Sequence, residues 1–211
     1  MKVALIGATG NAGSRILAEL SRRGHEVTAI VRNPDGVPTE AHVTARKGDV
    51  SDEGPLSELL AGHDVAVSAV RFAQSDPHKL IGAARSSGVA RYLVVGGAGS
   101  LEVAPGVRLV DTPDFPSAYK AEASAGAAFL DLLRQERELD WTYISPSAMF
   151  VPGERTGRFR LGRDQLLANE NGSSISFEDY AIALVDEVEK PGHSRQRFTV
   201  GYRRPSISGK G

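Results

Sequence analysis

Residues 2–17 read KVALIGATGNAGSRIL, and this stretch decides the fold. Its apolar, β-branched opening predicts a buried strand over residues 2–7, and the periodic apolar residues that follow predict a helix over residues 11–23. A turn that joins a strand to a helix so abruptly needs positions without a Cβ, and such positions let a phosphate group approach the backbone. The turn supplies three of them at intervals of three: Gly7, Gly10 and Gly13.

The alternation of strand and helix continues along the chain. Apolar runs predict further strands over residues 26–31, 42–46, 64–70, 91–95, 141–145 and 196–201, and amphipathic runs predict helices over 52–61, 77–87, 118–139 and 177–190. Alternating elements with near-continuous apolar strands are typical of a parallel sheet that helices cover on both faces. The sequence therefore predicts an α/β protein of Rossmann type, with a doubly wound, mostly parallel sheet and a small C-terminal substrate-binding region.

Three segments lack this periodicity. Residues 100–117 contain three prolines and several apolar residues, and we expect either a functional loop or a surface excursion that packs back on the core. Residues 146–176 are irregular, and we assign them to the substrate side of a single domain that spans residues 1–202. The basic segment 203–211 is expected to form a flexible tail.

Composition argues against several classes of function. The 211 residues carry 25 Lys and Arg against 26 Asp and Glu, a net charge of −1, so no positive field favours nucleic acid or an anionic membrane. The chain has no cysteine, which removes thiolate nucleophiles and thiolate metal sites, and its 5 histidines lack metal-ligand spacing, so we expect no bound metal. The sequence has no signal-peptide pattern and no membrane-spanning apolar run. We expect a cytoplasmic protein, either a monomer or a small homo-oligomer.

The glycine turn also fits a dinucleotide. N–H groups at the start of the predicted helix, with the positive end of its dipole, can hold a pyrophosphate against Thr9, Gly10, Asn11, Ala12 and Gly13. NAD-selective sites usually carry an acidic residue about 20 positions further on, which binds the ribose 2′-hydroxyl. This chain has Arg32 there, whose guanidinium can pair with a 2′-phosphate unless it is simply a solvated loop cation. We therefore predict NADP(H) as the preferred cofactor and NAD(H) as the alternative.

Five further segments stand out beside the glycine turn: VRNP (31–34), GDV (48–50), VGGAGSL (95–101), DTPDFP (111–116) and WTYISP (141–146). Together with that turn, they resemble the atypical short-chain dehydrogenases. Within that superfamily the chain is most similar to the bacterial proteins called NADH-flavin reductases, relatives of NmrA-like proteins and of biliverdin reductase B. The resemblance implies further cofactor contacts: Asp49 and Val50 at the adenine, Ser68, Ala69 and Val70 at the ribose, Gly96 and Gly97 at the nicotinamide, and Pro146.

The residues that would donate a proton form an incomplete pair. Carbonyl reduction in short-chain dehydrogenases uses a tyrosine hydroxyl and a lysine four residues later on the same helix face. Tyr119 is followed four positions later by Ala123, and Lys120 is preceded four positions earlier by Pro116. We keep Lys120 as a candidate contact of the nicotinamide ribose and Tyr119 as a candidate donor from a shifted register, although Tyr119 equally fits aromatic packing.

An acceptor that spreads charge over a conjugated ring needs little acid–base help from a protein. The sequence therefore predicts an NAD(P)H-dependent reductase of small flavin-like or quinone-like acceptors, with FMN or FAD as candidate substrates. Candidate walls of the acceptor site are Met149, Phe150 and Phe115, and core packing is the stronger alternative for Phe150. Two other functions stay open: a non-catalytic, NmrA-like dinucleotide-sensing regulator, and a sugar-nucleotide epimerase or dehydratase, which the incomplete pair disfavours.

Overall fold

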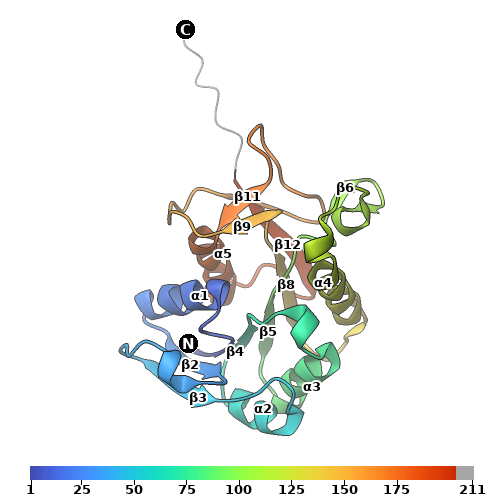
Figure 1. Ribbon diagram of the computed structural model, residues 1–211. Helices are drawn as coiled ribbons and strands as arrows, with labels where there is room; N and C mark the ends of the chain where they lie inside the picture. Colours follow the sequence, from blue (N-terminus) through green and yellow to red (C-terminus); the bar gives the residue numbers. More distant parts are fainter. Residues whose placement is uncertain (203–211) are drawn as a thin grey trace.

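The computed structural model describes residues 1–202, and in them helices cover both faces of one central sheet (Figure 1). Every neighbouring strand pair of this sheet within residues 1–202 is parallel except the edge pair of β10 with β12, so the predicted Rossmann-type sheet is confirmed. The predicted tail, 203–211, lies outside the described residues. The strands in spatial order are β10 (Arg160–Gly162), β12 (Gln196–Gly201), β8 (Trp141–Ser145), β5 (Arg91–Val95), β4 (Val65–Ser68), β1 (Lys2–Ile6), β2 (Glu26–Val31) and β3 (Val43–Lys47).

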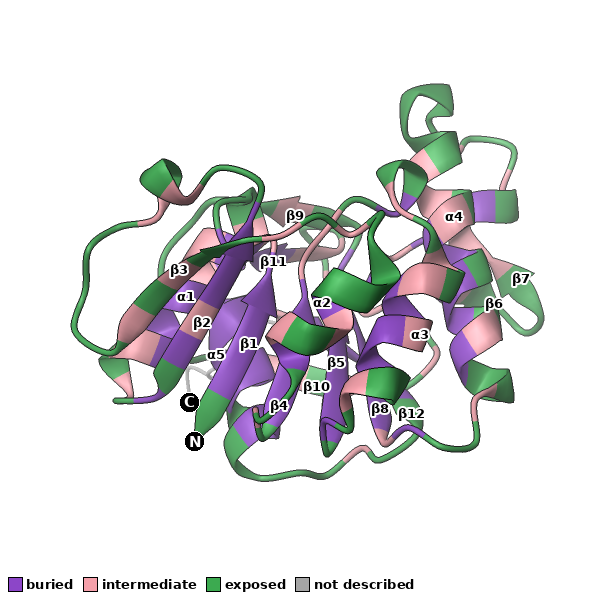
Figure 2. Ribbon diagram, turned by 90° about the horizontal axis from the view of Figure 1, so that it is seen from below, coloured by how far each residue is buried: buried purple, intermediate pink, exposed green. Residues whose placement is uncertain are grey.

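Side chains alternate along the strands and build a core on each face. In β1, Val3 and Leu5 join one cluster, and Ala4 and Ile6 join the other. The first cluster includes the buried stripes of α1 (Asn11–Arg22) and α5 (Phe177–Glu189). The second lies under α2 (Glu53–Leu60), α3 (Pro77–Ser87) and α4 (Ser117–Gln135). The central strands are buried along almost their whole length (Figure 2), which explains their near-continuous apolar sequence.

The order of the strands reverses beside β1. From β1 the chain builds outward through β2 to β3 on one side, and through β4 and β5 to β8 on the other. Ligands of open α/β sheets bind outside the carboxyl ends of the strands at such a reversal. The carboxyl ends of β1 and β4 therefore locate the candidate site, and the glycine turn follows the first of them directly.

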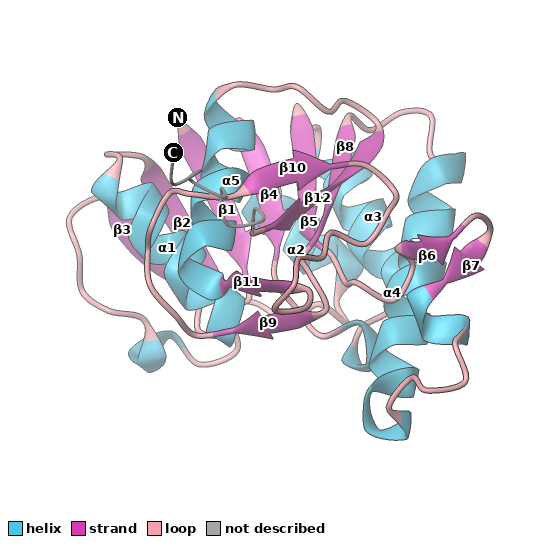
Figure 3. Cartoon of the chain, turned by 90° about the horizontal axis from the view of Figure 1, so that it is seen from above, coloured by secondary structure: helices cyan, strands magenta, loops and turns pink. Residues whose placement is uncertain are grey.

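The segment 100–117 is not structureless. It contains a short hairpin, β6 (Glu102–Ala104) with β7 (Val107–Arg108), and a 3₁₀ turn, η3 (Leu109–Asp111), and the hairpin projects beside α4 (Figure 3). Leu101 and Val110 are buried at its base, whereas Val103 and Val107 on the hairpin are exposed, so only part of the apolar content packs back on the core. Strands of two or three residues are too short to give a detectable period, which is why the sequence predicts none here.

Two other sequence expectations need correction. The segment 146–176 is not irregular throughout, because it contributes β10 and a parallel pair of three-residue strands, β9 (Met149–Val151) and β11 (Ser174–Ser176). Helix α4 ends at Gln135 rather than at residue 139, because the Glu136 carboxylate accepts the N–H groups of Glu138 and Leu139 and turns the chain.

Candidate dinucleotide site

The glycine turn is packed so closely that two of its positions exclude any side chain. Gly7 has a φ of +81°, and a Cβ there would lie 2.5 Å from the Ala69 carbonyl oxygen, at the end of β4. A Cβ at Gly13 would lie 2.0 Å from the Gly7 carbonyl oxygen. These two glycines therefore hold the start of α1 against β1 and β4, as a backbone-to-backbone contact.

Gly10 is different, because it is exposed and has an ordinary extended backbone, with φ −72° and ψ 172°. The nearest atom to a Cβ at Gly10 would be the Gly7 carbonyl oxygen, at 3.4 Å. Gly10 is the N-cap of α1, where no side chain caps the helix and no acidic residue occupies the first turn. The first N–H groups of a helix have no partner inside the helix. The turn therefore fits a pyrophosphate, since it presents donors and leaves open the space that a Cβ would fill.

A second group of predicted residues lies beyond β2. Arg32 is exposed, and the turn after it, η1 (Pro34–Gly36), lies beside the glycine turn, since a Cβ at Gly36 would be 3.6 Å from the Thr9 side chain. The pKa of Asp49 is lowered first by hydrogen bonds from the Ser51 N–H and hydroxyl, and then by the charges of Arg32 and Lys79. Thr9, Arg32 and Asp49 are thus brought to one edge of the sheet.

The residues predicted at the ribose lie at the carboxyl end of β4. Ser68 has an exposed fraction of 2%, and its hydroxyl lies 2.9 Å from the Tyr92 hydroxyl, within the core under α3 and α4. A ligand at this strand end would therefore meet the half-buried Ala69 and Val70 rather than the Ser68 side chain. The chain then turns into η2 (Phe72–Gln74), so β4 is two residues shorter at this end than predicted. Val50 packs against the same core cluster.

At the end of β5, Gly96 and Gly97 lie against a buried tyrosine. The Gly97 N–H donates to the Tyr143 hydroxyl at 3.0 Å, and that hydroxyl donates to the Gly126 carbonyl of α4 at 3.0 Å. Pro146, which follows β8, is buried. The strand ends predicted to meet the nicotinamide half, those of β5 and β8, are neighbours in the sheet.

The start of α4 contains no tyrosine–lysine pair. Tyr119 has an exposed fraction of 67%. The Lys120 ammonium donates to the Val110 carbonyl and lies 5.8 Å from the centre of the Phe115 ring, so it fastens the segment before α4. Ala123, which stands where the second member of the pair would be, packs against Gly99.

The three predicted wall residues of the acceptor site differ in their surroundings. The Phe150 ring lies 4.5 Å from that of Phe177 and 4.7 Å from that of Tyr180, which is the core packing weighed from the sequence. Met149, its neighbour on β9, has an exposed fraction of 59%. Phe115 is half-buried near Lys120. Met149 and Phe115 therefore remain the accessible apolar candidates.

Sequence reasoning missed residues that hold the loops of the site. The Glu122 carboxylate of α4 accepts the N–H groups of Phe72 and Ala73 at 2.8 and 2.9 Å. At the start of α5 the Asp179 N–H donates to Ser176 Oγ at 3.0 Å, and the buried Asp179 carboxylate accepts the N–H and hydroxyl of Thr156. The bonds that the Glu122 and Asp179 carboxylates accept join residues far apart in the chain, so no local sequence pattern predicts them.

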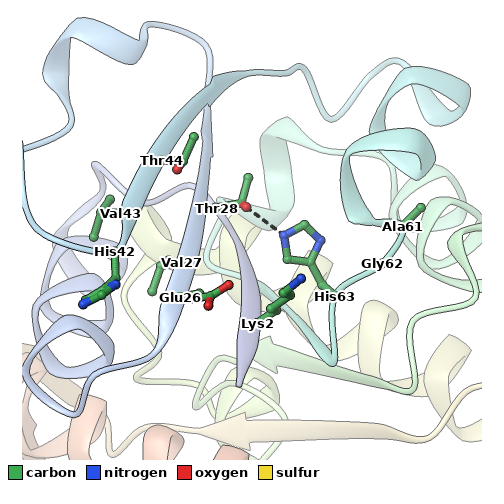
Figure 4. A pocket seen from close by; sticks show the side chains of 10 residues that line it. All are labelled: Lys2, Glu26, Val27, Thr28, His42, Val43, Thr44, Ala61, Gly62 and His63. Atoms are coloured by element: carbon green, nitrogen blue, oxygen red, sulfur yellow. Dashed lines mark hydrogen bonds between the residues drawn. The ribbon is translucent and has the colours of Figure 1, made fainter.

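A cavity of about 520 Å³ lies away from this site, among the amino-terminal ends of β1, β2 and β3 (Figure 4). His63 lines it, and both ring nitrogens have partners, Thr28 Oγ1 at 2.7 Å and the Leu60 carbonyl at 3.1 Å. Its position at the opposite ends of the strands separates it from the glycine turn. The remaining lining residues are Lys2, Glu26, Val27, His42, Val43, Thr44, Ala61 and Gly62.

Within residues 1–202, no helix has both the length and the apolar character needed to cross a membrane. In the same residues, no group of three or more His, Asp or Glu side chains is arranged to hold a metal ion.

Comparison with known proteins gives matches over nearly the whole chain. Residues 7–191 match the model of a family described as NAD(P)H-binding. The uncharacterized Bacillus subtilis protein YwnB is 44% identical over a match that covers 95% of this chain and 98% of YwnB. A Bacteroides thetaiotaomicron structure, provisionally named an epimerase, has a TM-score of 0.91 at 43% identity and covers 95% of this chain and 96% of its own. A Streptococcus pneumoniae structure, provisionally named an NADH-flavin reductase, has a TM-score of 0.85 at 40% identity and covers 96% and 100%.

Proposed function

The chain belongs to the NAD(P)H-binding family, and from this premise we propose that it is a reductase that uses NADPH to reduce a small flavin-like or quinone-like acceptor. When bound, the dinucleotide supplies the hydride. The residues of this chain would hold the dinucleotide, orient it and keep water from the reacting faces. The Streptococcus pneumoniae relative with a flavin reductase name supports this class of acceptor.

The glycine turn and Arg32 would hold the cofactor at two points. The first-turn N–H groups of α1 would receive the pyrophosphate, and Gly10 leaves room for it. Arg32 would pair with the 2′-phosphate, a charge-assisted contact worth about 1.5–3 kcal/mol, or roughly a ten- to hundredfold preference for NADPH over NADH. Asp49, whose lowered pKa keeps it ionised, lies within the electrostatic reach of Arg32 and would help to orient its guanidinium.

One observation carries the choice of acceptor: Lys120, the candidate lysine, is bonded to the Val110 carbonyl, and Tyr119 extends into solvent. An aldehyde or ketone forms a localised alkoxide on reduction and needs a positioned acid. A flavin or quinone distributes the new charge over its rings, so solvent can deliver the proton. The groups around this site therefore suit a ring acceptor better than a carbonyl.

The test is to mix purified protein with NADPH or NADH, add FMN or menadione, and follow the loss of absorbance of the reduced nicotinamide. We expect NADPH oxidation that depends on both protein and acceptor, with NADH used less well. Tight NADPH binding without oxidation by any acceptor would instead support a dinucleotide-sensing regulator. Conversion of UDP-glucose in the presence of NAD, without net oxidation, would support an epimerase, the name carried by the Bacteroides relative.

A further inference from the structure

A fully buried tyrosine on β8, Tyr143, joins the loop after β5 to helix α4. Its hydroxyl accepts the Gly97 N–H at 3.0 Å and donates to the Gly126 carbonyl at 3.0 Å. Burial raises the pKa of the Tyr143 phenol, which therefore keeps the proton that it donates. One side chain thus satisfies two backbone groups that belong to different elements.

The surrounding contacts show that the loop and the ring are fitted to each other. A Cβ at Gly96 would lie 2.3 Å from the Tyr143 ring, and a Cβ at Gly126 would lie 2.9 Å from the Phe72 ring and 3.3 Å from the Tyr143 hydroxyl. The Phe72 and Tyr143 rings stack with their centres 6.1 Å apart. Since Glu122 of α4 holds the Phe72 N–H at 2.8 Å, the loops after β4 and β5 are both tied to α4 through this group.

We propose that Tyr143 is a positioning residue, which sets the Gly96–Gly97 backbone at the end of β5 for the nicotinamide half of the dinucleotide. This inference rests on the proposed function. In a doubly wound sheet, each side of the strand reversal takes one half of a dinucleotide. Arg32 follows β2 on one side of the reversal, and Gly97 follows β5 on the other, so the Tyr143 contact lies on the half away from the adenine.

The experiment compares two ligands by calorimetry in Tyr143→Phe. NADPH requires both halves of the site, whereas adenosine 2′,5′-bisphosphate requires only the adenine half. Loss of the hydroxyl leaves the Gly97 N–H and the Gly126 carbonyl without their partner, and the loop loosens. We expect NADPH affinity to fall about three- to tenfold and bisphosphate affinity to change less than about twofold.

Tyr180→Phe is the matched control. Tyr180 is also fully buried, and its hydroxyl donates to the Ile144 carbonyl at 2.7 Å. That carbonyl also accepts the Gly96 N–H at 2.8 Å, so removal of the Tyr180 hydroxyl leaves it bonded. We expect both ligands to keep their affinity in this variant. Equal losses of both ligands in Tyr143→Phe, or no loss of NADPH, would overturn the proposal.

Two additions keep the test decisive. If Tyr143→Phe does not fold, Gly126→Ala is the second variant, because its Cβ displaces the Phe72 ring at 2.9 Å and crowds the Tyr143 hydroxyl at 3.3 Å without removing a hydrogen-bonding group. It should give the same selective loss of NADPH. Exchange of the Gly97 amide with deuterium needs no ligand, and it should accelerate about tenfold in Tyr143→Phe. Unchanged exchange would refute the positioning role, whereas failure of the wild-type protein to reduce any acceptor would refute only the proposed function.

Discussion

Replacing Gly10 by alanine should weaken cofactor binding strongly while leaving the fold intact. Gly10 lies at the exposed N-cap of α1 with a backbone conformation that alanine adopts freely. Its added Cβ would meet the Gly7 carbonyl oxygen at 3.4 Å, which is close but acceptable, and would otherwise occupy the space assigned to the pyrophosphate.

The size of each effect follows from these contacts. Alanine is a poorer N-cap than glycine by roughly 0.5–1 kcal/mol, and its lower entropy in the unfolded chain returns about 0.4–1 kcal/mol, so the free energy of unfolding should change by less than about 1 kcal/mol. A methyl group at this point displaces the phosphate from at least one N–H donor. A charge-assisted hydrogen bond is worth about 1.5–3 kcal/mol, so NADPH affinity should fall roughly ten- to hundredfold.

Gly13→Ala is the contrasting variant. Its Cβ would lie 2.0 Å from the Gly7 carbonyl oxygen and 3.2 Å from the Ala8 Cα, and both are backbone atoms that cannot rotate away. The start of α1 would have to move from β1. We expect a loss of roughly 1–3 kcal/mol in the free energy of unfolding together with the loss of NADPH binding.

Urea unfolding gives the stability, and calorimetry with NADPH gives the affinity. The proposed site predicts that Gly10→Ala separates the two measurements and that Gly13→Ala does not. If Gly10→Ala bound NADPH as tightly as the wild type, no phosphate would approach the turn at this point, and the assignment of the glycine turn would fail.

Four further outcomes are expected. Arg32→Ala should weaken NADPH binding roughly ten- to hundredfold and spare NADH, whereas equal losses in titrations with both cofactors would leave Arg32 as a solvated cation. Tyr119→Phe should keep acceptor reduction within about twofold, because its hydroxyl is solvated, and a loss of kcat above about a hundredfold would make it the proton donor. A hydrogen bond from Arg155 is the largest cause that lowers the pKa of the buried Glu19 below 4.5, so this pair stabilises the fold fully above pH 4.5 and loses that effect as the pH falls through the lowered pKa. In urea unfolding, the stability difference between Arg155→Ala and the wild type should therefore shrink in acid, and a difference that stays constant with pH would contradict this. His63→Ala should alter the distant cavity and leave the affinity for NADPH unchanged in titrations. If the cofactor bound in that cavity, the same variant would weaken NADPH binding.

The sequence predicts those helices and strands that are long enough to show a clear hydrophobic period. The long helices and the buried parallel strands are visible because each repeats its period several times, and the glycine turn is visible because its spacing is local. The strands β6, β7, β9, β10 and β11 have two or three residues each and therefore leave no period. Ser68 illustrates a further limit, since the sequence places it at a strand end but does not determine which way its hydroxyl points.

The contacts that hold the site are the part that sequence reasoning could not reach. Glu122 meets Phe72 across 50 positions of sequence, and Tyr143 meets Gly97 across 46. Neither pair has a spacing that follows from helix or strand geometry, because the separation is set by the whole strand order. A carboxylate in a helix and an apolar run that contains a tyrosine are ordinary patterns, so only the folded chain identifies these residues as partners.

The polar side chains around the strand ends share one use, and it bears on the chemistry. Lys120, Glu122 and Tyr143 each bind backbone groups: the Val110 carbonyl, two N–H groups of η2, and the pair at Gly97 and Gly126. A side chain that is already hydrogen-bonded to a loop backbone is a poor proton donor to a substrate, because transferring its proton would break the bond that holds the loop. Under the proposed function, these three residues would therefore position the nicotinamide rather than supply a proton, and such a site would favour acceptors that can take a hydride before they take a proton.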